Sequence, residues 1–182
     1  MNTKLFIVIC VFALASSGCR KDDSGTNPPP PPQENWTFPQ DSTTNIKVFS
    51  EISSAAVGDA FDVKVILYNV TDVFGSAVEL TYSSAHVQIT SVLAGPLFAP
   101  ETDILTVSHV DPGMNLASFG VTYRAGSGRS VNGSGVLFKL KCKGTSPGTA
   151  VFTINPAALE IRKTDNTIAN PPIRPALSVN VH

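Results

Sequence analysis

Several features that mark common functional classes are scarce in this sequence. Lys and Arg total 13 against 14 Asp and Glu in 182 residues, and the longest basic cluster is the alternating Lys139, Lys141 and Lys143. Because nucleic-acid binding requires clustered cationic side chains that displace counterions, we exclude nucleic acid as a partner. Charged residues are only 15% of the chain while 42% are hydrophobic, so most of it can bury a core and need not be disordered.

Residues for catalysis and metal binding are scarce as well. The three histidines, at 86, 109 and 182, lie in different segments, and no Gly-x-Ser-x-Gly motif is present, so no nucleophilic triad is expected. His109 and Asp111 could begin a metal site at a strand end, but two ligands do not complete one. No acidic pair suits glycoside hydrolysis, and no calcium loop with alternating Asp is found. We predict a protein that is not an enzyme and uses no cofactor or metal.

Long hydrophobic runs are limited to the N-terminus. Residues 5–15 are all apolar, Lys4 precedes them, and small residues follow at 16–18. This is the pattern of a secretory signal peptide, which we place at residues 1–18. A helix of this length spans about 16 Å, roughly half of a bilayer's hydrocarbon core, so a permanent membrane span is the weaker alternative.

Cys19 follows this signal directly. Its surroundings resemble a bacterial lipobox, in which the cysteine is linked to diacylglycerol and becomes the acylated N-terminus. That family usually has Leu, Val or Ile three places before the cysteine, whereas this chain has Ser16 there and its nearest leucine is Leu14. The resemblance implies lipidation of Cys19 and a membrane anchor. Ordinary cleavage is the alternative, although it leaves an exposed thiol in an oxidising compartment.

The next segment is expected to be a tether. Residues 20–23, Arg-Lys-Asp-Asp, are similar to a short export signal of some Gram-negative lipoproteins, which implies the outer membrane and the cell surface; a solvated start of the tether is the alternative. Five prolines at 28–32 predict a polyproline II spacer of about 15 Å, with a proline-rich ligand as the alternative. We place the tether at residues 19–44 and the folded domain at 45–182, and expect Trp36 to pack against the domain edge.

Short runs with alternating polarity predict an all-β domain. No stretch of ten residues after about position 46 has helical periodicity. The positions expected to point inward are Phe61, Val63, Val65, Leu67, Val78, Leu80, Tyr82, Val136, Phe138, Leu140 and Cys142. The residues between them, among them Lys64 and Lys139, are expected to face water. Cys142 is then a small buried hydrophobe and forms no disulfide with an acylated Cys19.

Further strands are expected in seven other runs: residues 46–50, 87–93, 104–109, 116–123, 149–154, 159–162 and 176–181. The glycine-rich residues 126–135 are expected to form a flexible hairpin connection. Roughly nine or ten strands of this length fit an antiparallel β-sandwich of two sheets.

The order of several short segments resembles the cohesin domain over residues 46–181. These segments are residues 57–59, 63–65, 68–70, 75–82, 91–98, 133–140 and 146–149. The chain departs from the family at residues 82–87, where a Tyr-Asp-Pro followed by Leu is usual. The resemblance implies a jelly-roll sandwich, related to carbohydrate-binding modules, with about nine strands.

Cohesins of cellulosomes bind dockerins, which are calcium-loaded modules on polysaccharide-degrading enzymes. The resemblance therefore implies a non-catalytic surface dock for a protein partner, possessing a dockerin-like module, but it transfers no binding residue. Carbohydrate binding is a weaker alternative, because stacking on sugar needs exposed aromatics and the chain offers only Trp36, Tyr68, Tyr82 and Tyr123 besides phenylalanine. A purely structural envelope domain is the third possibility.

Overall fold

The computed structural model describes residues 34–182, so the predicted signal peptide, Cys19 and the proline run lie outside the described residues. Residues 35–182 form one compact unit, which begins ten residues before the predicted domain start at residue 45. No helix in the described part is long and apolar enough to span a bilayer.

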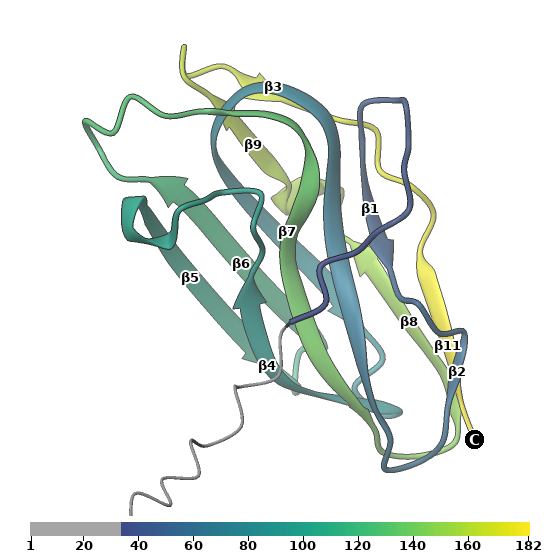
Figure 1. Cartoon of the computed structure of the whole chain (residues 1–182). Coiled ribbons are helices and arrows are strands. Elements are labelled where there is room, and N and C mark those ends of the chain that lie inside the picture. Colours follow the sequence, from purple (N-terminus) through teal and green to yellow (C-terminus); the bar gives the residue numbers. More distant parts are fainter. Residues whose placement is uncertain (1–33) are drawn as a thin grey trace, which may run out of the picture. The chain divides into compact units, whose positions relative to one another are not determined.

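The described residues contain eleven strands and two single-turn 3₁₀ helices (Figure 1). In chain order they are β1 (Asn45–Phe49), β2 (Ser54–Ala55), β3 (Ala60–Tyr82), β4 (Val87–Ala94), η1 (Glu101–Asp103), β5 (Ile104–Asp111), β6 (Leu116–Tyr123), β7 (Val131–Gly144), β8 (Gly148–Ile154), η2 (Pro156–Ala158), β9 (Glu160–Lys163), β10 (Ile168–Ala169) and β11 (Leu177–Val181). The predicted all-β class is confirmed, and nine strands remain when the two-residue β2 and β10 are set aside.

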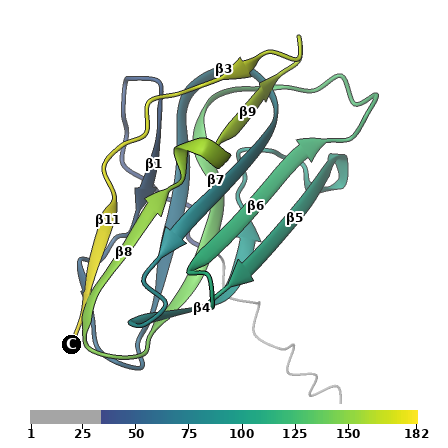
Figure 2. The same ribbon diagram turned by 180° about the vertical axis from the view of Figure 1, so that it is seen from behind.

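Two sheets face each other, and the long strand β3 belongs to both (Figures 1 and 2). Its first half pairs with β1 and β7, and β7 pairs with β4; we call this layer the β7 sheet. Its second half pairs with β6, β8 and β9, while β5 extends the layer beyond β6 and β11 extends it beyond β8; we call this layer the β6 sheet. All these pairs are antiparallel, as expected for a jelly-roll sandwich.

The continuity of β3 corrects the prediction of separate strands at residues 61–67 and 78–82. The chain turns from one sheet to the other through irregular pairing between Leu67 and Val73. Asn69 and Asp72 adopt left-handed conformations there, with φ of 49° and 60°. Their N–H groups donate to the Ser134 hydroxyl and the Asn132 amide oxygen at 2.9 Å each. Side chains thus replace ladder bonds at the bend, as is typical of bulges.

The same contacts order half of the glycine-rich stretch. Residues 131–135 begin β7, so the prediction of a flexible connection over all of 126–135 was wrong for this part. Gly135 lies beneath Leu97, whose Cδ1 would be 3.0 Å from an added Cβ. Close packing of this kind explains a glycine inside a strand.

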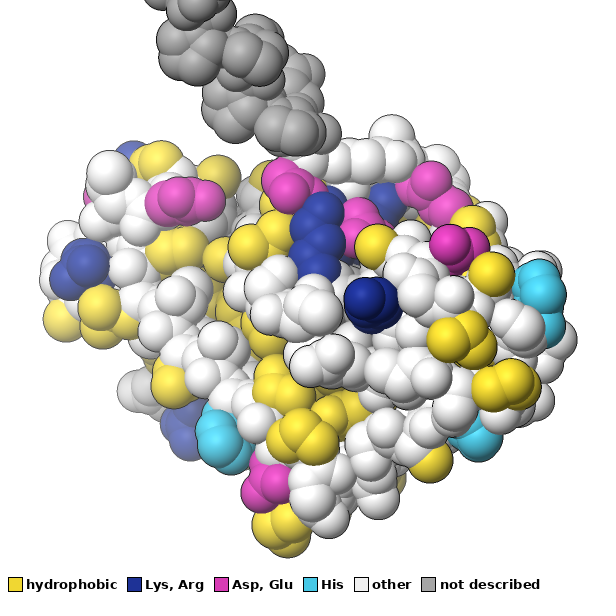
Figure 3. Space-filling view, turned by 90° about the horizontal axis from the view of Figure 1, so that it is seen from below, with side chains coloured by type: hydrophobic (Ala, Val, Ile, Leu, Met, Phe, Trp, Pro, Cys, Tyr) yellow, Lys and Arg dark blue, Asp and Glu magenta, His cyan; other side chains and the backbone are white. Residues whose placement is uncertain are grey.

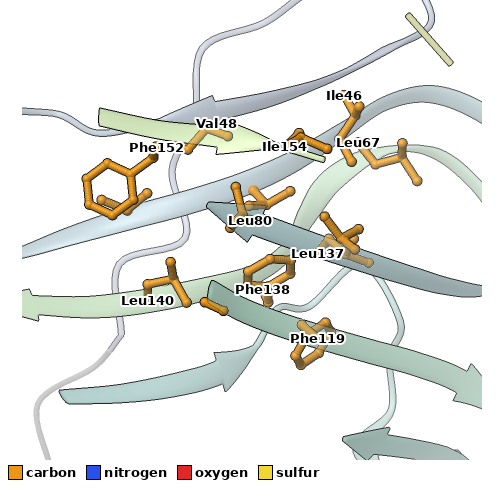
Figure 4. Packing of buried hydrophobic residues seen from close by; sticks show 14 of the residues in the cluster. Ile46, Val48, Leu67, Leu80, Phe119, Leu137, Phe138, Leu140, Phe152 and Ile154 are labelled. Atoms are coloured by element: carbon orange, nitrogen blue, oxygen red, sulfur yellow. The ribbon is translucent and has the colours of Figure 1, made fainter. Parts of the chain in front are cut away.

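The core lies between the sheets (Figure 4). Phe119 of β6 stacks on Phe138 of β7 with ring centroids 4.6 Å apart. Most of the inward positions predicted from alternation are buried here, but Val136 points to the other side of β7, where it contacts Ile66 and Tyr68. The reason is a pairing irregularity that brings Leu137 as well as Phe138 into the core, because a bulge shifts the alternation by one residue.

Cys142 lies in this core with 1% of its surface exposed. Burial raises the pKa of its thiol to about 12, with the nearby Asp62 carboxylate adding to the shift. A thiol in this environment stays protonated at neutral pH and is a poor nucleophile.

Residues 35–44, which we call the strap, lie across the outer surface of the β7 sheet. Trp36 and Phe38 cover the apolar side chains of Ile66, Tyr68 and Val136. The Tyr68 hydroxyl donates to the Pro39 carbonyl at 2.7 Å, and the Phe38 ring meets Tyr68 edge-on at 5.9 Å. The tether segment nearest the domain is therefore part of its packed structure.

The strap also buries two lysines that were expected to face water. Lys64 and Lys139, which pair across β3 and β7, are 1% and 0% exposed. The Lys64 ammonium donates to the Thr37 carbonyl at 2.8 Å, and Lys139 lies 4.5 Å from the centroid of the Trp36 ring. The burial of these lysines could not be predicted from alternation, because the strap that covers them has the composition of a linker. Each buried charge needs such partners to offset its desolvation.

The Glu51 carboxylate accepts hydrogen bonds from Asn35 and Thr37 of the strap, so we expect acid to loosen the strap. The Lys64 ammonium, 2.9 Å from Glu51, lowers the pKa of that carboxyl below its ordinary 4.5. Hydrogen bonds from Thr43, first its N–H and then its hydroxyl, lower the pKa of Asp41, which also pairs with Arg174 at 3.0 Å. A carboxyl whose pKa is lower in the folded state contributes stability above its unfolded pKa, and this is lost as pH falls through the folded value.

Trp36 is the only tryptophan, so its emission reports on the strap. We expect that emission to shift to longer wavelength below about pH 4.5, before circular dichroism shows loss of the sheets. Glu51→Gln should remove part of this pH dependence. A Trp36 emission that stays constant until the sheets unfold would contradict the role given to these carboxylates.

Candidate functional site

The outer surface of the β6 sheet differs from that of the β7 sheet, because the strap does not cover it. The register of β5, β6 and β3 aligns its outward side chains in rows. One row contains Leu105, Thr122 and Gly75, and the next contains Val107, Gly120 and Ala77. β9 continues both rows, with Arg162 opposite Gly75 and Glu160 opposite Ala77.

Small residues in the middle of these rows leave a hollow of about 410 Å³. Its lining residues are Gly75, Ser76, Ala77, Leu105, Thr106, Val107, Gly120, Val121, Thr122, Glu160 and Arg162. Gly120 is needed for this shape, since a Cβ there would be 3.0 Å from Cγ1 of Val107. A second hollow of about 220 Å³ shares Ala77, Val107 and Gly120 and extends toward His109 and Ala158.

Apolar side chains form one bank of this double hollow and charged groups the other. Leu105 and Val107 of β5 are 50% and 69% exposed, which is unusual for two neighbouring outward positions of one strand. On the opposite bank Arg162 pairs with Glu160. Apolar area beside a polar rim is characteristic of protein-binding surfaces.

Charge does not mark a second binding surface on the face seen in Figure 3. Viewed from below, acidic and basic side chains lie interspersed and no large area carries one sign (Figure 3). Many of the charges near the strap are already paired: Asp62 contacts Lys139 at 3.2 Å and Lys141 at 3.5 Å. The exposed apolar bank is therefore the more specific feature.

The residues considered for chemistry do not form a cluster in the described part of the chain. His109 is exposed on β5, whereas Asp111 accepts a hydrogen bond from the Met114 N–H within the following turn at 3.1 Å. His86 lies beside Ser146 near the β7–β8 turn. Among the described residues no group of three or more His, Cys, Asp or Glu is placed to hold a metal ion.

The tyrosines do not provide a platform for sugar rings. Tyr68, Tyr82 and Tyr123 are all at most 8% exposed, and burial raises the pKa of each phenol. Trp36, which is part of the strap, packs against the domain as predicted, with its ring over Lys139. The three tyrosines therefore offer no exposed ring on which a polysaccharide could stack.

The residues of the hollow could not be identified as a site from the sequence pattern. A signal was available: alternation around the inward-facing Ile104 puts Leu105 and Val107 on the outward side of an otherwise ordinary strand. The contribution of Gly75, Ala77 and Gly120 to the hollow could not be predicted from the sequence, because it depends on the register between β3 and β6.

Comparison with known proteins agrees with this architecture. The family model described as "Cohesin domain" matches residues 46–178. A type II cohesin domain from the cellulosome of Acetivibrio cellulolyticus superposes with a TM-score of 0.67 at 15% identity, covering 76% of this chain and 95% of that one. No curated protein matches the chain in sequence.

Two further structures show how wide the similarity is. A non-cellulosomal cohesin from the archaeon Archaeoglobus fulgidus has a TM-score of 0.62 at 20% identity, over 78% of this chain and 92% of that one. A type I cohesin from Clostridium thermocellum, solved in a cohesin–dockerin complex, has a TM-score of 0.63 at 18% identity, over 76% and 99%. These likenesses establish the fold. Because the family model spans most of the chain, this protein belongs to the cohesin domain family.

Proposed function

We propose that the chain is a cell-surface lipoprotein whose cohesin domain attaches another protein without catalysis, and that the partner has a dockerin-type module. The observation that carries the proposal is the uncovered hollow between Leu105, Val107 and the Glu160–Arg162 pair. Family membership supports the class of partner, since cohesins from Acetivibrio cellulolyticus and Clostridium thermocellum were solved in complex with dockerins.

The hollow suits a ridge of side chains on the partner. Its floor consists of Gly75, Ala77 and Gly120 on rigid neighbouring strands, which allows a partner's backbone to come close. Leu105 and Val107 supply apolar area that is already ordered, so little conformational entropy is lost on binding. The Arg162 and Glu160 side chains at the rim favour a partner with polar groups beside an apolar stripe.

Carbohydrate binding receives less support, because the three tyrosines are buried. A structural role without a partner is the remaining alternative. Immobilised residues 20–182, which contain the strap, should capture proteins from the organism's secreted and envelope fractions, with and without calcium. Recovery of proteins that share a small Asp-rich duplicated module would support the dock. Binding only to insoluble polysaccharide, or no capture at all, would contradict it.

The membrane anchor rests on the sequence around Cys19. If Cys19 is lipidated, Cys19→Ala abolishes fatty-acid labelling and moves the protein from the membrane fraction to the soluble fraction. Cys142→Ala is the matched control and should stay attached, because Cys142 lies in the core. Membrane attachment and labelling that persist in Cys19→Ala would refute the lipoprotein assignment.

A further inference from the structure

Sheet edges are a hazard for any β-sandwich, because their unpaired N–H and C=O groups can bind another chain. Most edges in the described residues are protected. β4 has a bulge between Ile89 and Ser91, and the free side of β1 bonds to Pro172 and Arg174. β2 and β10 have only two residues each.

The strand β5 lacks these protections. It runs for eight residues, pairs only with β6, and shows no register shift. It contains no Lys, Arg or Pro, and its residues from Leu105 to His109 are all exposed. In the part of the chain that the structure describes, no segment pairs with its second edge.

The hydrogen-bonding pattern shows which groups are available. The Arg124 N–H donates to the Asp103 carbonyl at 2.8 Å, in the register that β5 and β6 continue. Because bonded pairs alternate along an antiparallel ladder, Leu105, Val107 and His109 bond to β6. The N–H and C=O groups of Thr106 and Ser108 therefore point away from the sheet.

We infer that two copies of this chain pair through β5, antiparallel and with Thr106 opposite Thr106. This symmetric register places Leu105 of each copy opposite Val107 of the other, which gives two apolar cross-strand pairs. It also places Asp103, whose carboxylate pairs with Arg129 at 2.8 Å, at the position opposite His109. Shifting the centre to Val107 would instead place Leu105 opposite His109, and both Leu105–Val107 pairs would be lost.

The pairing has a consequence for presentation of the hollows. An antiparallel pair continues one sheet into the other, so the outer surfaces of both β6 sheets face the same side. Two hollows then lie on one continuous surface, and a partner with two modules would bind with increased avidity. The pairing itself needs no partner, so its test is independent of the proposed function.

Cysteine pairs test the register directly. In residues 20–182, Thr106→Cys puts two thiols opposite each other at a Cα separation of about 5.5 Å, which a disulfide bridges. Ser108→Cys is the matched control on the same side of the same strand; it is offset by four residues, about 13 Å, from its counterpart. Under mild oxidation we expect a covalent dimer from the first variant only. Equal dimer from both variants, or none from the first, overturns the proposed pairing.

Sedimentation measures the association without cross-linking. The protein of residues 20–182 should approach twice the monomer mass with rising concentration. A lysine at an edge blocks strand addition, so Thr106→Lys should weaken the dimer at least about tenfold. Ser178→Lys, exposed on β11, should leave it unchanged. Monomer at every concentration, or equal weakening by both variants, would also overturn the inference.

Discussion

Ala77→Lys should reduce the affinity for the protein partner on the order of 100-fold, or about 2.7 kcal/mol. Ala77 is exposed and lies on the floor of both hollows, between Gly120 and Glu160 in the register. A long cationic side chain there would fill the space and bring a charge into the centre of the interface. Central, desolvated positions have the largest effects on binding.

The matched control is Thr153→Lys. Thr153 is exposed on β8 and points outward from the same sheet, opposite Thr81, but lines neither hollow. Isothermal titration of both variants with a captured partner measures the difference. Both should have wild-type urea midpoints, because each substitution is on the surface. Equal affinity of Ala77→Lys and the original chain would show that the partner binds elsewhere.

Removal of the strap should destabilise the domain by about 2–4 kcal/mol. This range follows from the partial burial of Trp36 and Phe38, each worth about 1.5–3 kcal/mol when fully buried. Removal also takes away the carbonyl acceptors of Lys64 and Tyr68. A chain that starts at residue 45 loses all of these contacts, whereas a chain that starts at Asn35 keeps them.

Urea unfolding of the two chains measures this effect. The midpoint should fall by about 1–2 M when the strap is absent, at the usual dependence for domains of this size. A chain that starts at Arg20 provides the control and should match the one that starts at Asn35. Equal midpoints for starts at 35 and 45 would mean that the strap contributes nothing.

The hollow and the strap are the features that sequence patterns revealed least. The strands of the sandwich were predictable because alternation of apolar residues is local, as at Val63, Val65 and Leu67. The continuity of β3 was not predictable, because its bend depends on Ser134 and Asn132, some 60 residues further along the chain.

The burial of Lys64 and Lys139 also could not be predicted from the sequence pattern. Charged residues on alternate positions usually face water, and only a covering segment with acceptors and an aromatic ring changes that outcome. That segment follows a run of five prolines, where composition predicts a linker. The sequence pattern did place apolar Leu105 and Val107 on the outward side of β5. It could not show that they border a hollow, because the hollow also requires the small residues on the neighbouring strands.

Amide hydrogen exchange on the captured complex locates the partner's binding surface on the domain. Binding through the hollow should slow exchange in β5, in β6 and in the second half of β3, and leave β1 and β4 unchanged. Val107 and Gly120 should lie at the centre of the protected region. Protection confined to the β7 sheet, or no protection on binding, would show that the partner does not bind at the hollow.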